Sequence, residues 1–303
     1  MIHAPAPAEA AWLTDIYAGT VTGFCALQSM HALSDWAAQF CAERFAPFDP
    51  QHIHRHHAPG TLADLINKAG HAFQRDPTAG RLMRSVFEEA GLRLADTAAD
   101  RLILRIQPPV SVMGDGPAHA RSAPLAFHRD TWGSNLYAQV NWWAPIFPVT
   151  RERTIALFPC YWDRPIRNTS AAFNLPHIIA RRKADPGSLT PSDAVPHALD
   201  MVEEDEARPV VIDPGTIIAF SGQHAHASIR NLTSLTRFSL DTRTLSIRDT
   251  KQGRGAPNID GDAPFMALKL FRRLSDDTAL AQLIGAEDFV PYHRFQKSSP
   301  GHP

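Results

Sequence analysis

The sequence predicts a mainly β protein in which an N-terminal helical layer packs against an antiparallel sheet or barrel. The main observation is a change of pattern near residue 100. Ala and Leu recur at helical spacing before it, and short runs of β-branched and aromatic residues follow it. At 303 residues the chain can bury a sizeable core. We expect a single domain over 1–303, with a helical layer over 1–100, a β core over 101–250 and a C-terminal extension over 251–303.

Three helices are predicted in the first part of the chain. Apolar residues recur every three to four positions over 24–45 and over 61–74, as they do on one face of a helix. A third helix is expected over about 79–91, because Asp76-Pro77-Thr78 supplies a cap and a first turn. Together these helices are long enough to cover one face of a sheet.

The strands are predicted after Asp100. Each is a short run of β-branched and aromatic residues, and turn residues such as Asp213-Pro214-Gly215 separate them. The expected strands are 102–107, 136–144, 154–159, 209–213, 216–221 and 237–247. The polar, proline-rich stretch from about 160 to 207 is interpreted as an insertion between strands, and 296–303 as a loose tail.

Composition excludes several classes of protein. Lys plus Arg (30) nearly balance Asp plus Glu (31), so charge gives no case for binding nucleic acid or a membrane surface. No stretch approaches the roughly 20 apolar residues of a spanning helix, and the first residues do not resemble a signal peptide. The three cysteines lie far apart and form no pair with metal-site or disulfide spacing. We therefore expect a cytoplasmic protein.

The triplet His128-Arg129-Asp130 is the first sign of a functional site. Two imidazoles and one carboxylate are the ligands that hold non-haem Fe(II) on one face and leave other positions open. Residues i and i+2 of a strand point to the same side, so His128 and Asp130 can reach one ion together. An isolated pair of this kind is more often structural, with the histidine hydrogen-bonded and the aspartate capping a turn.

The downstream segment favours the metal interpretation. It reads as a turn, an apolar strand, the two histidines His224 and His226, and a strand that opens with Arg237. Arg237 and Ser239 have the same parity, so they share a face and can both meet a carboxylate. A buried Arg is costly unless an anion pairs with it, and its planar fork suits a carboxylate.

A His-x-Asp pair, a distal His and an Arg eleven residues later resemble the Fe(II)/2-oxoglutarate-dependent dioxygenases, in particular the phytanoyl-CoA dioxygenase-like family. The resemblance covers roughly residues 100–248 and includes FSGQHAHASIRN at 220–231. It implies a double-stranded β-helix core, of the jelly-roll or cupin-like kind, whose open end holds the metal. It also implies a catalytic domain that uses Fe(II), 2-oxoglutarate and O2.

The resemblance also implies roles for individual residues. His128, Asp130 and His226 would be the catalytic metal ligands. His226 is preferred over His224 because its spacing to Arg237 matches the family pattern. Arg237 would bind the distal carboxylate of 2-oxoglutarate, helped by Ser239. The family usually has a Gly-Ser-His-type loop where this chain reads FPCYWDRP at 158–165, which indicates a rebuilt substrate side.

Further pocket residues are expected on the neighbouring strands. Gln139, Asn141 and Trp143 share a face of the strand over 136–144. The two polar residues could hydrogen-bond the 2-oxo acid and Trp143 could wall the substrate pocket; packing and cross-strand pairing explain all three equally well. Arg243 shares the face of Arg237 and could hold an anionic substrate, although an ordinary salt bridge explains it better. The histidine-rich run 52–57 is interpreted as a loop and not as a metal site, because no carboxylate is organised with it.

The resemblance implies an enzyme that oxidises a small-molecule metabolite or natural-product intermediate while 2-oxoglutarate is decarboxylated to succinate and CO2. Related halogenases carry a small residue in place of Asp130, so hydroxylation is the expected reaction. Desaturation, cyclisation and epimerisation would use the same ligands. Two other classes stay open: a metal-dependent cupin-type enzyme that does not use 2-oxoglutarate, and a non-catalytic jelly-roll binding module. The substrate and the oligomeric state are not specified.

Overall fold

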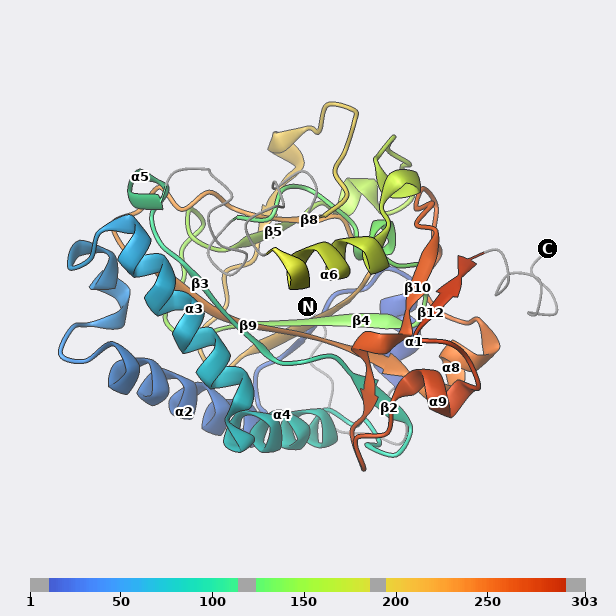
Figure 1. Cartoon of the computed structure of the whole chain (residues 1–303), viewed down its shortest axis with the longest axis horizontal. Coiled ribbons are helices and arrows are strands. Elements are labelled where there is room, and N and C mark those ends of the chain that lie inside the picture. The colour runs from blue at the N-terminus through green and yellow to red at the C-terminus, as the bar shows by residue number, and fades with distance from the viewer. Residues whose placement is uncertain (1–10, 114–123, 186–194, 293–303) are drawn as a thin grey trace.

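The computed structural model describes residues 11–113, 124–185 and 195–292. Its centre is a large antiparallel sheet that faces a much smaller one, with helices on the outer side of the large sheet (Figure 1). The fold is therefore the predicted one, mainly β with an N-terminal helical layer. Two antiparallel sheets facing each other agree with a double-stranded β-helix core.

The large sheet has seven strands, in the order β1-β7-β4-β9-β2-β11, with β3 also paired to β9. All of its pairings are antiparallel. The strands are β1 (Thr22–Phe24), β2 (Thr97–Ala99), β3 (Ile103–Gln107), β4 (Gln139–Pro145), β7 (Ile217–Ser221), β9 (Arg237–Ser246) and β11 (Arg272–Arg273).

The small sheet has three strands, in the order β6-β5-β8. They are β6 (Arg208–Pro209), β5 (Ile155–Leu157) and β8 (His226–Ser228). Apolar side chains of β5 pack against Trp143 of β4 and against Ile218 and Phe220 of β7, and this cluster joins the two sheets. A separate hairpin pairs β10 (Phe265–Ala267) with β12 (Phe289–Pro291).

In the described part of the chain, the four helices that precede β3 pack against the outer face of the large sheet (Figure 1). Asp76 caps α4 as predicted, because its carboxylate accepts a hydrogen bond from the Thr78 backbone N–H. The helices are α1 (Ala11–Tyr17), α2 (Gln28–Phe45), α3 (Pro59–Arg75), α4 (Pro77–Glu89), α5 (Val110–Met113), α6 (Leu175–Ala184), α8 (Ile247–Gln252) and α9 (Leu280–Ile284).

Trp142 is the centre of the packing between the helices and the large sheet. Its side chain is 1% exposed, and its ring contacts the rings of Trp12, Phe24 and Phe87 at centroid distances of 5.2–5.6 Å. The indole N–H donates to the Thr244 hydroxyl on the neighbouring strand at 2.9 Å. Large aromatic side chains contribute most of the burial in a core of this kind.

A Trp142→Ala substitution is expected to lower the free energy of unfolding by about 3–5 kcal/mol, because it removes a fully buried indole and leaves a cavity. Urea unfolding followed by circular dichroism measures this change. Leu232→Ala is the control, since Leu232 is 72% exposed and its loss is expected to change little. A loss below about 1 kcal/mol for Trp142→Ala would show that the helical layer contributes little to stability.

The predicted elements differ from the observed ones mainly at their ends. The helix expected over 24–45 begins at Gln28, because Phe24 is in β1, where it pairs with Ile217. Where a strand was expected over 209–213, the structure has only the two-residue strand β6 at Arg208–Pro209. The segment taken as an insertion contains the helix α6, and the tail expected at 296–303 lies outside the described residues. In the described part of the chain, no helix is long and apolar enough to cross a membrane.

Candidate metal centre

His128 and His226 face each other at one edge of the small sheet. Their backbones form an isolated antiparallel bridge, in which each N–H donates to the other carbonyl at 3.0 Å. His226 is the first residue of β8, where it pairs with Leu157 of β5. The two imidazole centroids are 4.2 Å apart. Two segments almost a hundred residues apart are thus joined at the point where both carry a histidine.

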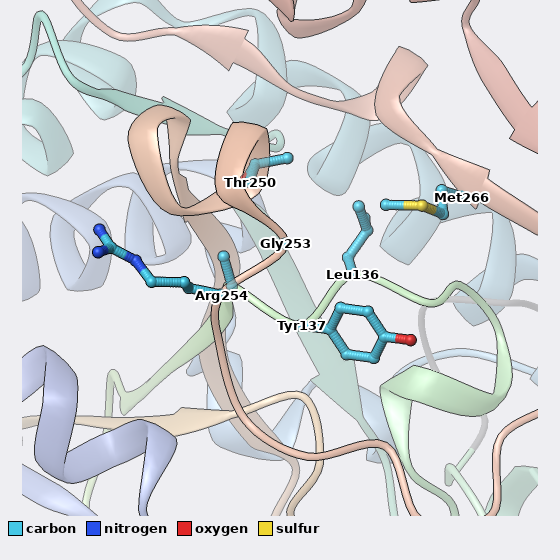
Figure 2. Close-up of a pocket in the computed structure, with 7 residues that line it drawn as sticks. Leu136, Tyr137, Thr250, Gly253, Arg254 and Met266 are labelled. Atoms are coloured by element: carbon cyan, nitrogen blue, oxygen red, sulfur yellow. The ribbon is translucent and has the colours of Figure 1, made fainter. Parts of the chain in front are cut away.

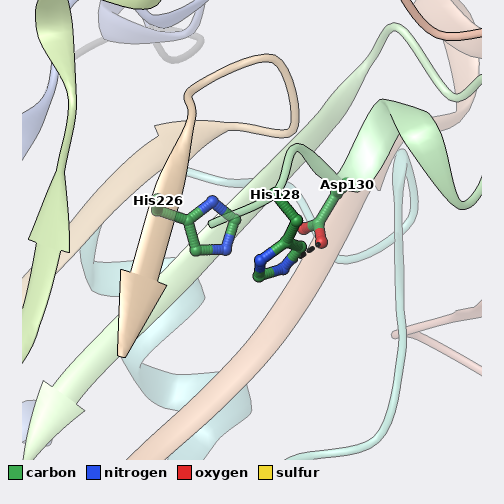
Figure 3. Close-up of side chains that lie close together, drawn as sticks. All are labelled: His128, Asp130 and His226. Atoms are coloured by element: carbon green, nitrogen blue, oxygen red, sulfur yellow. Dashed lines mark ion pairs between the residues drawn. The ribbon is translucent and has the colours of Figure 1, made fainter. Parts of the chain in front are cut away.

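Asp130 joins this pair through the backbone that follows His128. Arg129 is extended (φ −114°, ψ 145°), so the side chains of His128 and Asp130 emerge on the same side. The chain then turns into a 3₁₀ helix over Asp130–Trp132. A carboxylate oxygen of Asp130 lies 3.6 Å from Nε2 of His128, and the three side chains point toward one another (Figure 3).

The orientation of both imidazoles suits a metal ion. Nδ1 of His128 lies 2.8 Å from the Ala126 carbonyl, and Nδ1 of His226 lies 2.9 Å from the His224 carbonyl. A carbonyl only accepts, so each Nδ1 carries the proton and each Nε2 keeps its lone pair for a metal. One ligand atom from each of the three residues lies within 4.8 Å of the others. The donor set is that of a facial Fe(II) site.

The ionisation states also suit a cation. Burial, together with the nearby His128, lowers the pKa of His226 to about 4, so this imidazole is neutral at pH 7. Burial of Asp130 alone would raise its pKa. The contact with His128, the charge of Arg243 and the charge that His226 gains only when it is protonated at low pH outweigh burial, and they hold the pKa of Asp130 well below its usual range. Asp130 is therefore ionised while His226 is neutral, as metal ligation requires.

His224 does not take part in this cluster. Its Nδ1 lies 3.0 Å from the Ser221 hydroxyl, and its Nε2 lies 3.1 Å from the Gly19 carbonyl. Both ring nitrogens are therefore engaged with the surrounding chain. The geometry favours His226 over His224 as the third ligand.

A set of buried polar atoms without partners lies on the inner face of the large sheet. In the described part of the chain, every fully buried side-chain N or O atom that lacks a hydrogen-bond partner belongs to β3, β4 or β9. The cross-strand register puts all of these residues on one face, opposite to that of Trp142. They are Arg105, Gln107, Asn141, Trp143, Arg237, Ser239 and Asp241. Buried polar groups in folded proteins are rarely unsatisfied, so this face suits a polar ligand.

Arg237 combines a buried positive charge with two hydrogen-bond donors that have no partner among the described residues. It is 1% exposed, and its Nη1 donates to the Thr154 carbonyl at 2.6 Å. Nε and Nη2, which form one edge of the guanidinium, have no partner among the described residues. Burial and the charges of Arg105 and Arg153 lower the pKa of Arg237 to about 9, although Asp241 acts in the opposite direction. The free edge has the shape that binds a carboxylate with two hydrogen bonds.

The remaining predicted pocket residues lie on the same inner face. Gln139 donates from Nε2 to Asp130 at 2.8 Å and to the Asn141 side chain at 2.9 Å, so it touches a candidate metal ligand directly. The amide nitrogen of Asn141 and the indole nitrogen of Trp143 are both buried without a partner. Arg243 forms an ion pair with Asp100, in agreement with the salt-bridge interpretation.

Arg105 and Gln107 also lie on this inner face and were not among the predicted site residues. They alternate with Leu104 and Ile106 in the strand β3, and only the apolar half of that alternation packs against the helices. The register places Gln107 opposite Arg237 and Arg105 opposite Ser239. A polar residue at every second position of an otherwise apolar strand was the available signal.

Two other regions carry no comparable site. The cavity in Figure 2, lined by Leu136, Tyr137, Ala138, Thr250, Gly253, Arg254 and Met266, has a volume of about 10 Å³. That is room for a single water molecule. In the histidine-rich run, His54 is buried against the Thr236 hydroxyl at 2.8 Å. No metal-binding group of three residues forms there in the described part of the chain.

Comparisons with known proteins give only distant likenesses. No protein-family model and no curated protein sequence matches the chain, so membership of the phytanoyl-CoA dioxygenase-like family stays a prediction. Solved structures that align with it include a non-heme monooxygenase, ThoJ, in complex with nickel (17% identity, 78% of each chain, TM-score 0.44). The alpha-ketoglutarate-dependent carbocyclase SnoK from nogalamycin biosynthesis aligns at 12% identity, with 82% of this chain and 88% of SnoK covered (TM-score 0.46).

A third such structure is EvdO2 from Micromonospora carbonacea var. aurantiaca, complexed with 2-oxoglutarate. It is 13% identical, the alignment covers 81% of this chain and 94% of EvdO2, and the TM-score is 0.45. Likenesses at this level do not decide an activity. The functional argument therefore depends on the residues of the site.

Proposed function

We propose that the protein is an Fe(II)- and 2-oxoglutarate-dependent oxygenase that acts on a small molecule. The observation that carries this proposal is the combination of two features on facing sheets. One is a cluster of two histidines and an aspartate with free ligand atoms, and the other is a buried arginine with an unpaired edge. Neither feature is explained by packing, and together they provide for a metal ion and a dicarboxylate.

The spacing between the two features supports a five-carbon diacid. His226 pairs with Leu157 of β5, and Arg237 reaches the carbonyl of Thr154, three residues earlier in the chain. Three residues of extended chain span about 10 Å. That is about the reach of 2-oxoglutarate when one end is on a metal ion and the other accepts hydrogen bonds from a guanidinium. A site for a monocarboxylic acid would not need a buried cation at this distance.

The charges of the site also balance. An Fe(II) ion with Asp130 leaves a charge of about +1, and the 2-oxoglutarate dianion and Arg237 bring the total to about zero. A buried site without net charge avoids much of the desolvation penalty of isolated ions. Without the diacid, Arg237 is a buried cation whose free edge has no hydrogen-bond partner among the described residues.

Each residue has a definite task in this proposal. His128, His226 and Asp130 would hold the metal, while Gln139 holds the second oxygen of the Asp130 carboxylate. Arg237, with Ser239 on the same face, would orient the distal carboxylate of the co-substrate. Asn141 lies between the two ends and has a free N–H to donate to the 2-oxo acid. The bound iron would supply O2 activation coupled to decarboxylation of the 2-oxo acid.

The reaction on the substrate is proposed as hydroxylation of a small metabolite or natural-product intermediate. Asp130 would occupy a ligand position, which would leave no vacancy for halide. Trp143 has a buried indole N–H without a partner at the inner face, and it could contact either the co-substrate or the substrate. Desaturation, cyclisation and epimerisation would require only a different placement of the substrate above the same ligands.

The proposal is tested by following succinate formed from 2-oxoglutarate under air, with and without added Fe(II). Iron-dependent formation of succinate is the expected result. 2-Oxoadipate and pyruvate serve as controls for the diacid requirement. Iron-dependent O2 consumption without 2-oxoglutarate would point to a cupin-type oxygenase, and tight metal binding with no use of the diacid would also overturn the proposal.

A further inference from the structure

Arg129, the residue between two of the candidate metal ligands, is one of the most buried cations of the described chain. Its side chain is 0% exposed, and it leaves the backbone on the side opposite to His128 and Asp130. The proposed function gives it no role. A charged side chain is rarely buried so completely unless its hydrogen bonds serve a purpose.

The guanidinium of Arg129 binds four different points of the chain. Nη1 donates to the Gln223 carbonyl at 2.6 Å, and Nη2 donates to the carbonyls of Tyr161 and Arg164 at 2.5 and 3.0 Å. Nε donates to a carboxylate oxygen of Asp260 at 3.1 Å. Only the planar fork of an arginine can bind groups in this many directions at once.

The contact with Gln223 connects Arg129 to the third ligand. On one side of Gln223, the Gly222 carbonyl accepts a hydrogen bond from the Asp130 N–H at 3.0 Å. On the other side, the His224 carbonyl orients the His226 ring. One guanidinium therefore holds the backbone between His128 and Asp130 and also the turn that leads to His226. The guanidinium therefore contacts the two segments that carry the three candidate ligands.

Asp260 is the counter-ion of Arg129 and comes from the C-terminal extension. Its side chain is 4% exposed, and its carboxylate also accepts from the Trp132 indole N–H at 2.7 Å and from the Ile166 N–H at 3.0 Å. Trp132 belongs to the 3₁₀ turn that begins with Asp130. Asp260 thus accepts hydrogen bonds from Arg129, which precedes Asp130, and from Trp132, which follows it.

The backbone next to Asp260 lies tightly against the same segment. A Cβ atom on Gly261 would lie 2.8 Å from the carbonyl oxygen of Thr131, so only glycine allows this approach. Asn135 also donates from its side chain to the Ala263 carbonyl at 2.5 Å. Residues 258–263 therefore form a strap along 130–135, and we refer to them as the C-terminal strap.

We propose that Arg129 and Asp260 are positioning residues that hold the metal ligands in register, and that the C-terminal strap is a structural part of the metal centre. The inference rests on the proposed metal site. It adds that metal binding requires Arg129 and Asp260 as well as the three ligands. Outer contacts of metal ligands commonly change metal affinity by roughly 10–100-fold when they are removed.

The test compares two acid-to-amide variants in the full-length protein. Asp260→Asn removes the counter-ion of Arg129, while Asp200→Asn removes the partner of Arg167 in an exposed ion pair and serves as the matched control. Co(II) is titrated into the metal-free proteins, and both the dissociation constant and the visible absorption of the bound ion are recorded. Thermal unfolding in EDTA reports on stability separately.

We expect Asp260→Asn to weaken Co(II) binding by about 10–100-fold and to change the absorption bands, because the ligand geometry relaxes. Arg129→Lys, which keeps the charge but loses the fork, should do the same. Asp200→Asn should match the wild type. A lower unfolding temperature with unchanged Co(II) affinity and spectrum would overturn the inference and leave the metal site intact. A wild-type protein that binds no Co(II) would overturn the proposed function as well.

Discussion

An Asp130→Ala variant is expected to lose metal binding and the turnover of 2-oxoglutarate together. Asp130 is the only carboxylate of the three-residue cluster, so its removal leaves two imidazole ligands and no negative charge to compensate a divalent cation. Even the loss of outer contacts commonly costs roughly 10–100-fold in metal affinity. We therefore expect a loss of more than about 100-fold in the affinity for Co(II) or Fe(II), with succinate formation at background.

The matched control is Asp64→Ala, which removes an exposed carboxylate on α3, outside the cluster. It should bind metal and form succinate as the wild type does. Circular dichroism would establish that both variants are folded. If Asp130→Ala retains more than about a tenth of the wild-type affinity, then Asp130 is not a ligand and the site must be assigned differently.

Arg237→Met is expected to raise the KM for 2-oxoglutarate by about 100-fold or more. The substitution removes the free guanidinium edge, and each hydrogen bond between charged groups contributes about 1.5–3 kcal/mol. The KM of Arg237→Lys for 2-oxoglutarate should lie between those of the wild type and Arg237→Met, because lysine keeps the charge but lacks the planar fork of the guanidinium. Steady-state succinate formation at varied 2-oxoglutarate concentration measures this effect, with Co(II) affinity as the internal control for an intact metal site.

The same substitution should not destabilise the protein in the absence of 2-oxoglutarate. Arg237 is a buried cation with an unpaired edge, and the Thr154 carbonyl that it contacts also accepts from the Ile229 N–H at 2.9 Å. Replacing such a group with an apolar side chain of similar volume is often neutral or stabilising. Unfolding temperatures with and without 2-oxoglutarate and Co(II) test this. A large loss of stability without ligand would indicate a structural role for Arg237.

Much of this site was predictable because its signals are local in the sequence. The parity of His128 and Asp130, and of Arg237 and Ser239, correctly states which side chains share a face. The strands β3, β7 and β9 begin or end within a residue of the predicted limits. Their apolar and polar alternation follows directly from burial on one face and a ligand-facing surface on the other.

The contributions of distant segments were not predictable in the same way. Phe24 belongs to β1 because it packs on Trp142, and helical spacing in its neighbourhood does not reveal that contact. Asp260 reaches Arg129 across more than a hundred residues, in a segment without a recognisable motif. Metal binding by His128 and His226 requires the two residues to be close together in space. The bridge that brings them together is visible only in the tertiary structure.

The alternation along β9 separates two kinds of evolutionary constraint. Phe238 and Leu240 face the helical layer, whereas Ser239 and Asp241 face the proposed ligand. Substitutions at Phe238 and Leu240 are expected to lower the free energy of unfolding. Substitutions at Ser239 and Asp241 are expected to change ligand binding and to leave the packing against the helices unchanged. Alternate residues of this one strand therefore have two different roles: the helix-facing residues stabilise the fold, and the inner residues line the face at which the co-substrate is proposed to bind.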